Sequence, residues 1–178
     1  MNLGNLSLFT LGIIAYYIFV YRMKGGLVGI FPLGFEAINW LWLVAGYGSM
    51  VCVFLILLKI KSPEYFYDEA VDLLITTLSP FQLIITFILG GVAEELIFRG
   101  IIQLWFGLIP SSVLFTLIHV RYLKKPYMAL ETLCLGLILG TLYILTKSIW
   151  ICTVAHILMN MTTAWIIKSK KINYTPVI

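Results

Sequence analysis

Charged residues are scarce in this sequence: they make up 11% of its 178 residues, whereas hydrophobic residues make up 61%. A water-soluble domain of this composition would have too little polar surface to cover itself. We therefore exclude an ordinary soluble protein and expect the lipid bilayer to be the solvent. No Pro-, Gly- or Ser-rich linker and no internal repeat divides the sequence, which predicts a single integral membrane domain over residues 1–178.

Cysteine is rare as well, and its three residues lie in apolar runs without C-x-x-C spacing. This argues against a disulfide framework and against a cysteine metal site. The net charge of +4 could suggest nucleic acid, but Lys and Arg lie at the ends of apolar segments, where membrane proteins place them. We expect no nucleic-acid partner. Residues 3–21 are too long for a signal-peptide core and lack a basic leader, so we expect them to stay as a membrane helix.

Six apolar segments predict an all-α fold, a polytopic membrane helical bundle of about six transmembrane segments. A hydrocarbon core about 30 Å thick requires roughly 20 residues of helix. The segments lie near residues 3–21, 38–58, 80–105, 110–122, 126–146 and 148–167. The fourth is short and begins at Pro110, which indicates a half-span beside a cavity, because free backbone ends at membrane depth must be buried in protein or face water.

The stretch from residue 62 to residue 79 has a different pattern. Apolar residues alternate with the acids Glu64, Asp68, Glu69 and Asp72, and Pro63 is suited to a first helical turn. This pattern predicts an amphipathic helix that lies in the membrane interface.

Basic residues at the ends of the predicted spans indicate the orientation of the bundle. Arg99 is left out because it lies within a span. One side has eight basic residues: Lys59, Lys61, Arg121, Lys124, Lys125, Lys168, Lys170 and Lys171. The other side has three: Arg22, Lys24 and Lys147. We therefore expect a multi-pass protein with both termini in the cytoplasm.

Three ionisable residues lie within the third predicted span, although each costs at least about 2.5–3.5 kcal/mol at the bilayer centre. Glu95 and Arg99 are four residues apart, so they are neighbours on one helical face and can form a structural ion pair. Glu94 is rotated by about 100° from Glu95 and has no such partner in its own helix. It is our candidate general base.

Both histidines of the sequence also lie in apolar segments. His119 follows Phe115 by four residues, so the phenyl ring can shelter the imidazole, and His156 precedes Asn160 by the same spacing. A single buried histidine is usually structural. Two histidines, an asparagine and an acid pair on three different spans instead favour a functional site.

Other polar and small residues have simpler interpretations. Glu131 lies near the start of the fifth span, and we expect it to reach the interface or to pair with Lys125. The serine and threonine residues of the fourth span are expected to hydrogen-bond across helices. They are Ser111, Ser112 and Thr116. None lies in a G-x-S-x-G context, which gives a serine mechanism little support. Gly136 and Gly140 are expected to allow close helix approach.

The polar residues form three motifs in sequence order. These are Glu94-Glu95-x-x-x-Arg99, Phe115-x-x-x-His119 and His156-x-x-x-Asn160. They resemble the motifs of the CAAX-prenyl-protease and bacteriocin-processing (CPBP, also called Abi) intramembrane peptidases. The resemblance covers roughly residues 80–165.

This resemblance implies a helical bundle with a cavity open to the cytosol and hydrolysis of a peptide bond. Glu94 and His119 would activate a water molecule, and His156 and Asn160 would stabilise the oxyanion. Arg99 would hold Glu95 and shape the site. The residues alone do not decide which glutamate is the base, and the family analogy favours Glu94.

A zinc mechanism is the alternative, because Glu94, His119 and His156 would be an adequate set of zinc ligands. An H-E-x-x-H motif is absent from the sequence. The resemblance implies a glutamate-dependent enzyme, so we expect no cofactor and no metal.

The expected partners are the lipid bilayer and a peptide or membrane-protein substrate. The sequence does not identify a prenyl-binding groove, so a bacterial plasma-membrane protein that acts on a small or membrane-bound peptide is favoured. Its role could be peptide maturation or self-immunity against a bacteriocin. The alternatives are a non-catalytic immunity or scaffold protein and a proton-coupled transporter, although six spans are few for a transporter and no inverted repeat is visible.

Overall fold

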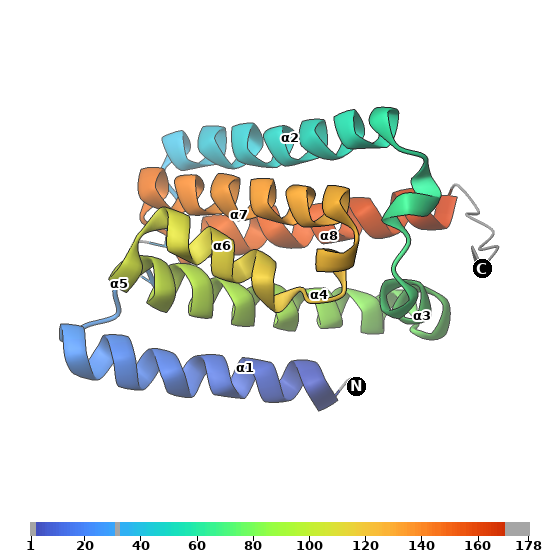
Figure 1. The fold of residues 1–178 in the computed structure, drawn as a ribbon. Coiled ribbons are helices and arrows are strands. Elements are labelled where there is room, and N and C mark those ends of the chain that lie inside the picture. Colours follow the sequence, from blue (N-terminus) through green and yellow to red (C-terminus); the bar gives the residue numbers. More distant parts are fainter. Residues whose placement is uncertain (1–2, 31–32, 170–178) are drawn as a thin grey trace.

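The computed structural model describes residues 3–30 and 33–169, and the regular elements within these ranges are all helices (Figure 1). The first half contains α1 (Leu3–Tyr16), η1 (Tyr17–Arg22), α2 (Ala37–Ile60), η2 (Pro63–Phe66) and α3 (Glu69–Thr77). The second half contains α4 (Pro80–Glu95), η3 (Leu96–Gln103), α5 (Leu104–Phe106), α6 (Leu108–Ile118), η4 (Tyr122–Lys124), α7 (Pro126–Thr146) and α8 (Ile149–Ser169).

The long helices run roughly parallel or antiparallel to one another and form a layered bundle. Helix α2 packs on α7 and α8, α8 packs on α4, and α6 lies against α7. Helix α1 is outermost, against α4, at the opposite side from α2 (Figure 1). This arrangement confirms the predicted all-α membrane bundle.

Helices at all six predicted apolar segments are present in the described chain, but they differ in length. Four are long and apolar enough to cross a membrane: Ala37–Ile60, Pro80–Phe106, Pro126–Thr146 and Ile149–Ile166. Two shorter apolar helices accompany them, at Leu6–Arg22 and Leu108–Ile118. The protein is therefore an integral membrane protein whose first and fourth predicted spans are its shortest.

The helix that carries the acid pair changes its winding beside the pair. It begins with a capping box, in which the Ser79 hydroxyl accepts a hydrogen bond from the Gln82 N–H and the Gln82 side chain accepts one from the Ser79 N–H. After Glu95 it continues as the π-helix η3, and Gly107, with φ of 85°, separates α5 from α6. Single π-helical turns are rare and frequently lie at functional sites.

The fourth apolar helix differs from its predicted range of 110–122. It begins at Leu108, directly after Gly107, so that Pro110 lies in the first turn, where a missing N–H costs no hydrogen bond. It ends at Ile118, and His119 lies beyond the helix with φ of −82° and ψ of 55°. The predicted end was wrong because the chain turns at His119 and re-forms only the short η4.

The predicted amphipathic helix over 62–79 was also only partly correct. The structure has η2 and α3 with an extended residue, Asp68, between them. The Asp68 carboxylate accepts a hydrogen bond from the Val71 N–H at 2.9 Å, so Asp68 is the N-cap that begins α3. A capping side chain therefore divides the segment into two helices.

The described chain begins and ends at the same end of the bundle, which is the end that carries α3 (Figure 1). The helix ends Lys59, Lys61 and Lys168 lie there with the η4 loop, whereas Arg22, Lys24 and Lys147 lie at helix ends on the other side. Lys170 and Lys171 lie outside the described residues. The alternation of the helices agrees with an even number of passes.

Candidate active site

The ion pair predicted within the third span is present and buried. The Arg99 Nη1 donates to Glu95 Oε1 at 3.2 Å, and Arg99 Nε lies 3.2 Å from Glu95 Oε2 as an ion-pair contact without hydrogen-bond geometry. The side chains are 1% and 0% exposed, respectively. Arg99 Nη2 also donates to the Gly136 carbonyl on α7 at 3.0 Å. The pair thus joins η3 to α7 and fixes both side chains.

His156 connects the ion pair to the second glutamate. Its Nδ1 lies 2.8 Å from Glu95 Oε1 and its Nε2 lies 3.7 Å from Glu94 Oε2. Glu95 Oε1 accepts a hydrogen bond from Arg99 and another from His156, and these two contacts hold the carboxylate in one orientation. Glu94 is 22% exposed and keeps a carboxylate face that is not engaged by Arg99.

His119 lies at the turn that follows α6. Its Nδ1 is 2.7 Å from the Phe115 carbonyl oxygen, and its ring stacks on Tyr122 with a centroid distance of 5.4 Å. A carbonyl can only accept, so Nδ1 carries the hydrogen, and in the neutral ring Nε2 is left with its lone pair. The backbone of α6 therefore sets the tautomer of His119.

Phe115 lies between the two histidines and the buried arginine. Its ring centroid is 4.9 Å from that of His119 and 6.0 Å from that of His156, and the Arg99 guanidinium lies 4.9 Å from it. Phe98 contacts it edge-on at 5.1 Å. The predicted shelter of His119 by Phe115 is present, and the same ring also supports Arg99 through a cation–π contact.

A cavity of about 200 Å³ brings the motif side chains together. Glu94, His119, His156 and Asn160 all line it. Glu95 and Arg99 are not among the lining residues and lie behind His156. The six predicted residues thus divide into four that face the cavity and two that hold the others in place.

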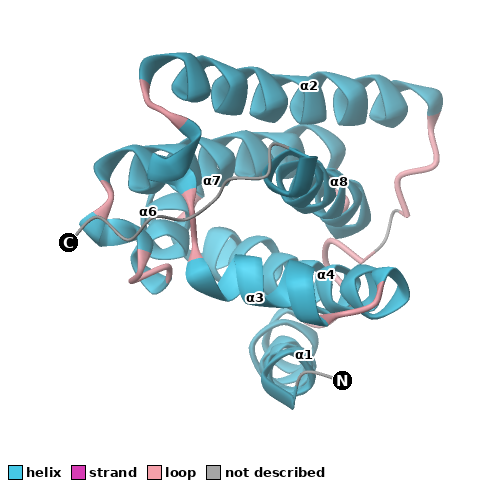
Figure 2. Ribbon diagram, turned by 90° about the vertical axis from the view of Figure 1, so that its right-hand side faces the viewer, coloured by secondary structure: helices cyan, strands magenta, loops and turns pink. Residues whose placement is uncertain are grey.

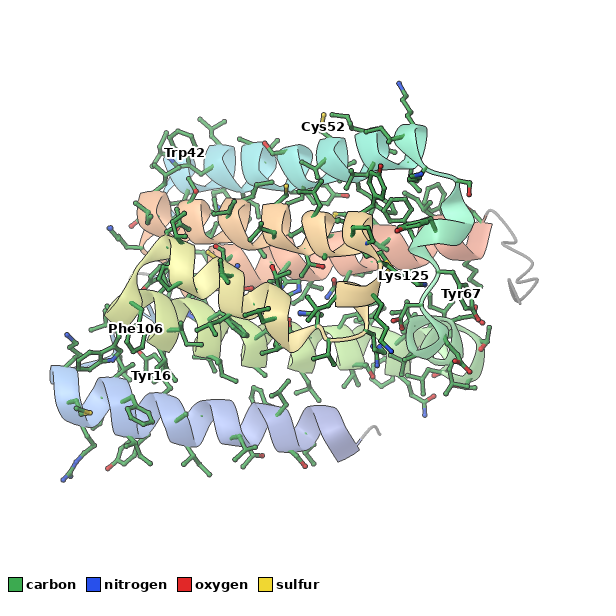
Figure 3. The ribbon with its side chains drawn as sticks, in the orientation of Figure 1. Tyr16, Trp42, Cys52, Tyr67, Phe106 and Lys125 are labelled. Atoms are coloured by element: carbon green, nitrogen blue, oxygen red, sulfur yellow. The ribbon has the colours of Figure 1, made fainter. Side chains whose placement is uncertain are left out.

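The rim of the cavity is built from the segment around α3 and from the η4 loop. Figure 2 shows the end of the bundle that carries α3. Arg121 Nε pairs with Asp68 Oδ2 at 3.0 Å, and the Lys125 ammonium donates to the Tyr67 carbonyl (Figure 3). Burial first, and then the Asp68 carboxylate, raise the pKa of Tyr122 to about 12, although Arg121 lowers it. The phenol beside His119 is therefore neutral at physiological pH.

One of the two expectations for Glu131, a pair with Lys125, was wrong. Lys125 contacts the Tyr67 carbonyl and not Glu131, whose side chain lines the cavity from α7. Met128 and Leu135, one turn away on either side, line the same cavity. Residues three or four apart lie on one face of a helix, so this spacing is the sequence signal that could have placed Glu131 in the cavity wall.

The small and hydroxyl residues show where the helices approach one another. A Cβ added to Gly136 would lie 3.3 Å from Ser112, so glycine permits the predicted close contact of α7 with α6. The Ser111 hydroxyl donates to the Phe98 carbonyl across helices at 2.8 Å. Ser112 and Thr116 instead donate to carbonyls of their own helix, so the predicted cross-helix bonding was correct for Ser111 alone of the three.

We tested whether the cavity residues fit a metal ion. Glu94, His119 and His156 have suitable chemistry, but within 3–30 and 33–169 no group of three or more His, Cys, Asp or Glu side chains has a metal-binding arrangement. As they are placed in the described chain, these side chains are therefore not gathered around one metal position.

Comparison with known proteins points to one family. Residues 76–162 match the family described as "Type II CAAX prenyl endopeptidase Rce1-like". Over 124 residues the chain is 27% identical to "Uncharacterized protein YpbD" of Bacillus subtilis (strain 168), covering 66% of each chain. Over 89 residues it is 36% identical to "Putative membrane peptidase YdiL" of the same organism, covering 46% of this chain and 35% of YdiL. No solved structure matches the chain.

The matched regions contain the site. Residues 76–162 include all three motifs, from Glu94 to Asn160. The alignments span about two thirds of the length of YpbD and about one third of that of YdiL.

Proposed function

Because this chain belongs to the CPBP family of Rce1-like membrane proteins, we propose that it is an intramembrane endopeptidase in which Glu94 activates a water molecule. One observation carries the choice of base. Glu95 is buried and engaged by Arg99 and His156, whereas Glu94 lines the cavity with an accessible carboxylate. A general base must reach the proton that it abstracts, so the accessible glutamate is the better candidate.

His119 is suited to assist Glu94 in binding that water. Its Nδ1–H is held by the Phe115 carbonyl, so its Nε2 lone pair is free to accept a hydrogen bond from water. Glu94 takes one water proton while the oxygen attacks the carbonyl carbon of the peptide. The C–N bond then breaks, and the same proton passes from Glu94 to the leaving amine.

The oxyanion formed in the first step requires hydrogen-bond donors. The Asn160 carboxamide lines the cavity and has no hydrogen-bond partner among the described residues, so its N–H groups are free to donate. His156 donates Nδ1–H to Glu95, and a proton on its Nε2 makes that atom the second donor. Each such donor can contribute about 3–4 kcal/mol to transition-state stabilisation.

The arrangement of charges supports a cytoplasmic opening of the cavity. The rim residues Arg121 and Lys125 lie at the end of the bundle with the excess of Lys and Arg, which the positive-inside rule assigns to the cytoplasm. We propose that the substrate is a small peptide or a membrane-bound peptide. Maturation of a peptide, or self-immunity against a bacteriocin, is the corresponding role in a bacterial plasma membrane.

Cleavage by the purified protein in lipid nanodiscs tests the proposal. A panel of membrane-presented peptides is incubated with wild type, Glu94→Gln and Glu69→Gln, and the products are identified by mass spectrometry. We expect Glu94→Gln to lower kcat/KM by about 10²- to 10⁴-fold while its thermal unfolding is unchanged. Glu69 is an exposed acid outside the cavity, so Glu69→Gln should cleave as wild type does.

The same assay distinguishes the alternatives. Full cleavage by Glu94→Gln together with loss in Glu95→Gln would transfer the base to Glu95. Loss of cleavage with a chelator, restored by zinc, would replace the glutamate mechanism with a zinc mechanism. If no peptide is cut and Glu94→Gln still protects cells against a bacteriocin, the protein is a non-catalytic immunity protein.

A further inference from the structure

Glu131 is an acidic side chain in the cavity wall that no described residue pairs with. It is partly buried on α7 and faces the same cavity as Glu94 and His119. Within the described chain, neither a hydrogen bond nor an ion pair reaches it. The neighbouring Thr132 hydroxyl donates to the Met128 carbonyl and is not a partner. A carboxylate removed from water without a partner costs free energy that a bound cation would offset.

The other acids of the cavity are paired. Asp68 is bound by Arg121 at 3.0 Å, and Glu94 faces His156 at 3.7 Å. The residues that line the cavity include neither lysine nor arginine. Glu131 is therefore the acid of the cavity lining that remains available to a cationic ligand.

The position of Glu131 relates it to the scissile bond. It lies five residues before Gly136, whose carbonyl binds Arg99 beside the acid pair. Five residues of helix rise about 7.5 Å. An extended peptide advances about 3.4 Å per residue. Glu131 therefore lies about 7.5 Å along α7 from the Gly136 carbonyl and lines the same cavity as Glu94, so a peptide whose scissile bond lies at Glu94 can present a side chain within about three residues to Glu131.

We propose that Glu131 is a specificity residue that binds the cationic side chain of a Lys or Arg in the substrate, within about three residues of the scissile bond. This inference rests on the proposed peptidase function and adds a substrate class to it. It also disfavours a C-a-a-X terminus as the substrate. Such a substrate brings its terminal carboxylate to the site, where the carboxylate of Glu131 would repel it.

A charge-swap experiment tests the inference with the full chain in nanodiscs. Fluorogenic peptides carry Lys, Gln or Glu at one position, up to three residues from the scissile bond, and kcat/KM is measured for each. Wild type should prefer Lys to Gln and cleave the Glu peptide slowest. In Glu131→Gln the Lys-to-Gln ratio should fall about tenfold or more, because a charge-assisted hydrogen bond is lost. In Glu131→Lys the preference should shift toward the Glu peptide.

Glu69→Gln is the matched control, since it changes the net charge equally at an exposed site outside the cavity. It should keep the wild-type ratio. An unchanged ratio in Glu131→Gln, or an equal loss of cleavage for all three peptides, would overturn the assignment. Thermal unfolding of each variant checks that the ratio is measured on folded protein.

Binding of the same peptides separates this inference from the proposed function. Fluorescence anisotropy measures the affinity of wild type and Glu131→Gln for the Lys and Gln peptides, whether or not they are cut. A Lys preference that Glu131→Gln removes, without any cleavage, would support the cation site and refute the peptidase. Cleavage that depends on Glu94 with no Lys preference, or no selective binding at all, would refute the cation site.

Discussion

The two ends of the bundle use their polar groups in opposite ways. At the end opposite α3, the loop between η1 and α2 is fixed by hydrogen bonds to helix ends: the Ile149 N–H donates to the Gly29 carbonyl at 2.9 Å and Trp150 Nε1 donates to the Ile30 carbonyl at 3.1 Å. The Tyr16 hydroxyl donates to the Val28 carbonyl in the same loop (Figure 3). We call this the closed end.

We call the end that carries α3 the cavity end. Two polar side chains there have no protein partner among the described residues. Glu131 and the Asn160 carboxamide face the cavity without a hydrogen bond from the described residues. Both side chains are only partly buried, so their polar atoms can be reached from the cavity. The difference teaches that hydrogen bonds fix the loop at the closed end, whereas the cavity end keeps accessible polar groups that a substrate can satisfy.

The largest loss of stability should come from the ion pair that supports the cavity end. Arg99→Leu leaves Glu95 buried with His156 as its remaining partner, and we expect a loss of about 3–5 kcal/mol in the free energy of unfolding. Arg22→Leu, at an exposed arginine, is the control and should change it by less than about 0.5 kcal/mol. Denaturant titration in detergent measures both.

A double variant extends this prediction. Glu95→Leu with Arg99→Leu removes both charges, so it should recover part of the stability lost in Arg99→Leu while cleavage stays absent. A double variant less stable than Arg99→Leu would show that the pair contributes net stability by itself.

The closed end should be next in sensitivity, at Gly29. This buried glycine has φ of +81°, and a Cβ there would lie 2.6 Å from the Tyr143 hydroxyl. Gly29→Ala combines an unfavourable backbone conformation with a clash and should cost about 2–4 kcal/mol. Gly25→Ala is the matched control, because Gly25 has φ of +77° with open space around it, and should cost about 1 kcal/mol. Equal costs would mean that Tyr143 moves aside freely.

A smaller effect is expected at Ser148, which is fully buried and donates to the Leu33 carbonyl at 3.2 Å. Ser148→Ala should lower the free energy of unfolding by about 1 kcal/mol without changing kcat/KM. Ser49→Ala removes an exposed hydroxyl that bonds within its own helix and should have almost no effect. A loss of activity in Ser148→Ala would show that the two ends are coupled.

The smallest effects should come from the rim pair at the cavity end. Arg121 is 63% exposed, so Arg121→Ala should cost at most about 1 kcal/mol and less at high salt. Asp68 also caps α3, and asparagine caps as well as aspartate does. Asp68→Ala should therefore be about 1 kcal/mol less stable than Asp68→Asn, as measured by thermal unfolding. If Asp68→Ala and Asp68→Asn were equally stable, the charge of Asp68 and not its capping hydrogen bond would account for its contribution.

Much of the helical framework could be predicted from the sequence, because apolar length determines where a chain crosses the bilayer. The Glu95–Arg99 pair was predictable too, since a four-residue spacing makes neighbours on a helix. The end of α6 and the division of the segment at 62–79 were not. They depend on the turn at His119 and on one capping carboxylate at Asp68, which apolar patterning does not reveal.

Contacts between helices account for most of what the sequence did not predict in the site. Spacing assigns residues to a face of a helix but not to a neighbour, so it did not predict that His156 would contact both glutamates. A pair of Glu131 with Lys125 was one of two expectations because the two are close in sequence, whereas Lys125 bonds to Tyr67, 58 residues away. The π-helical turn of η3 also has no sequence signal that we recognise.

The hydrogen-bonded loop at the closed end should help to keep the membrane closed to protons. Hydrolysis at bilayer depth requires water far from either surface, and a passage through the bundle would let protons leak. Here the polar cavity is confined to one end, and the loop carbonyls at Gly29 and Ile30 are occupied by α8 at the other. A membrane rich in this protein should therefore hold its proton gradient.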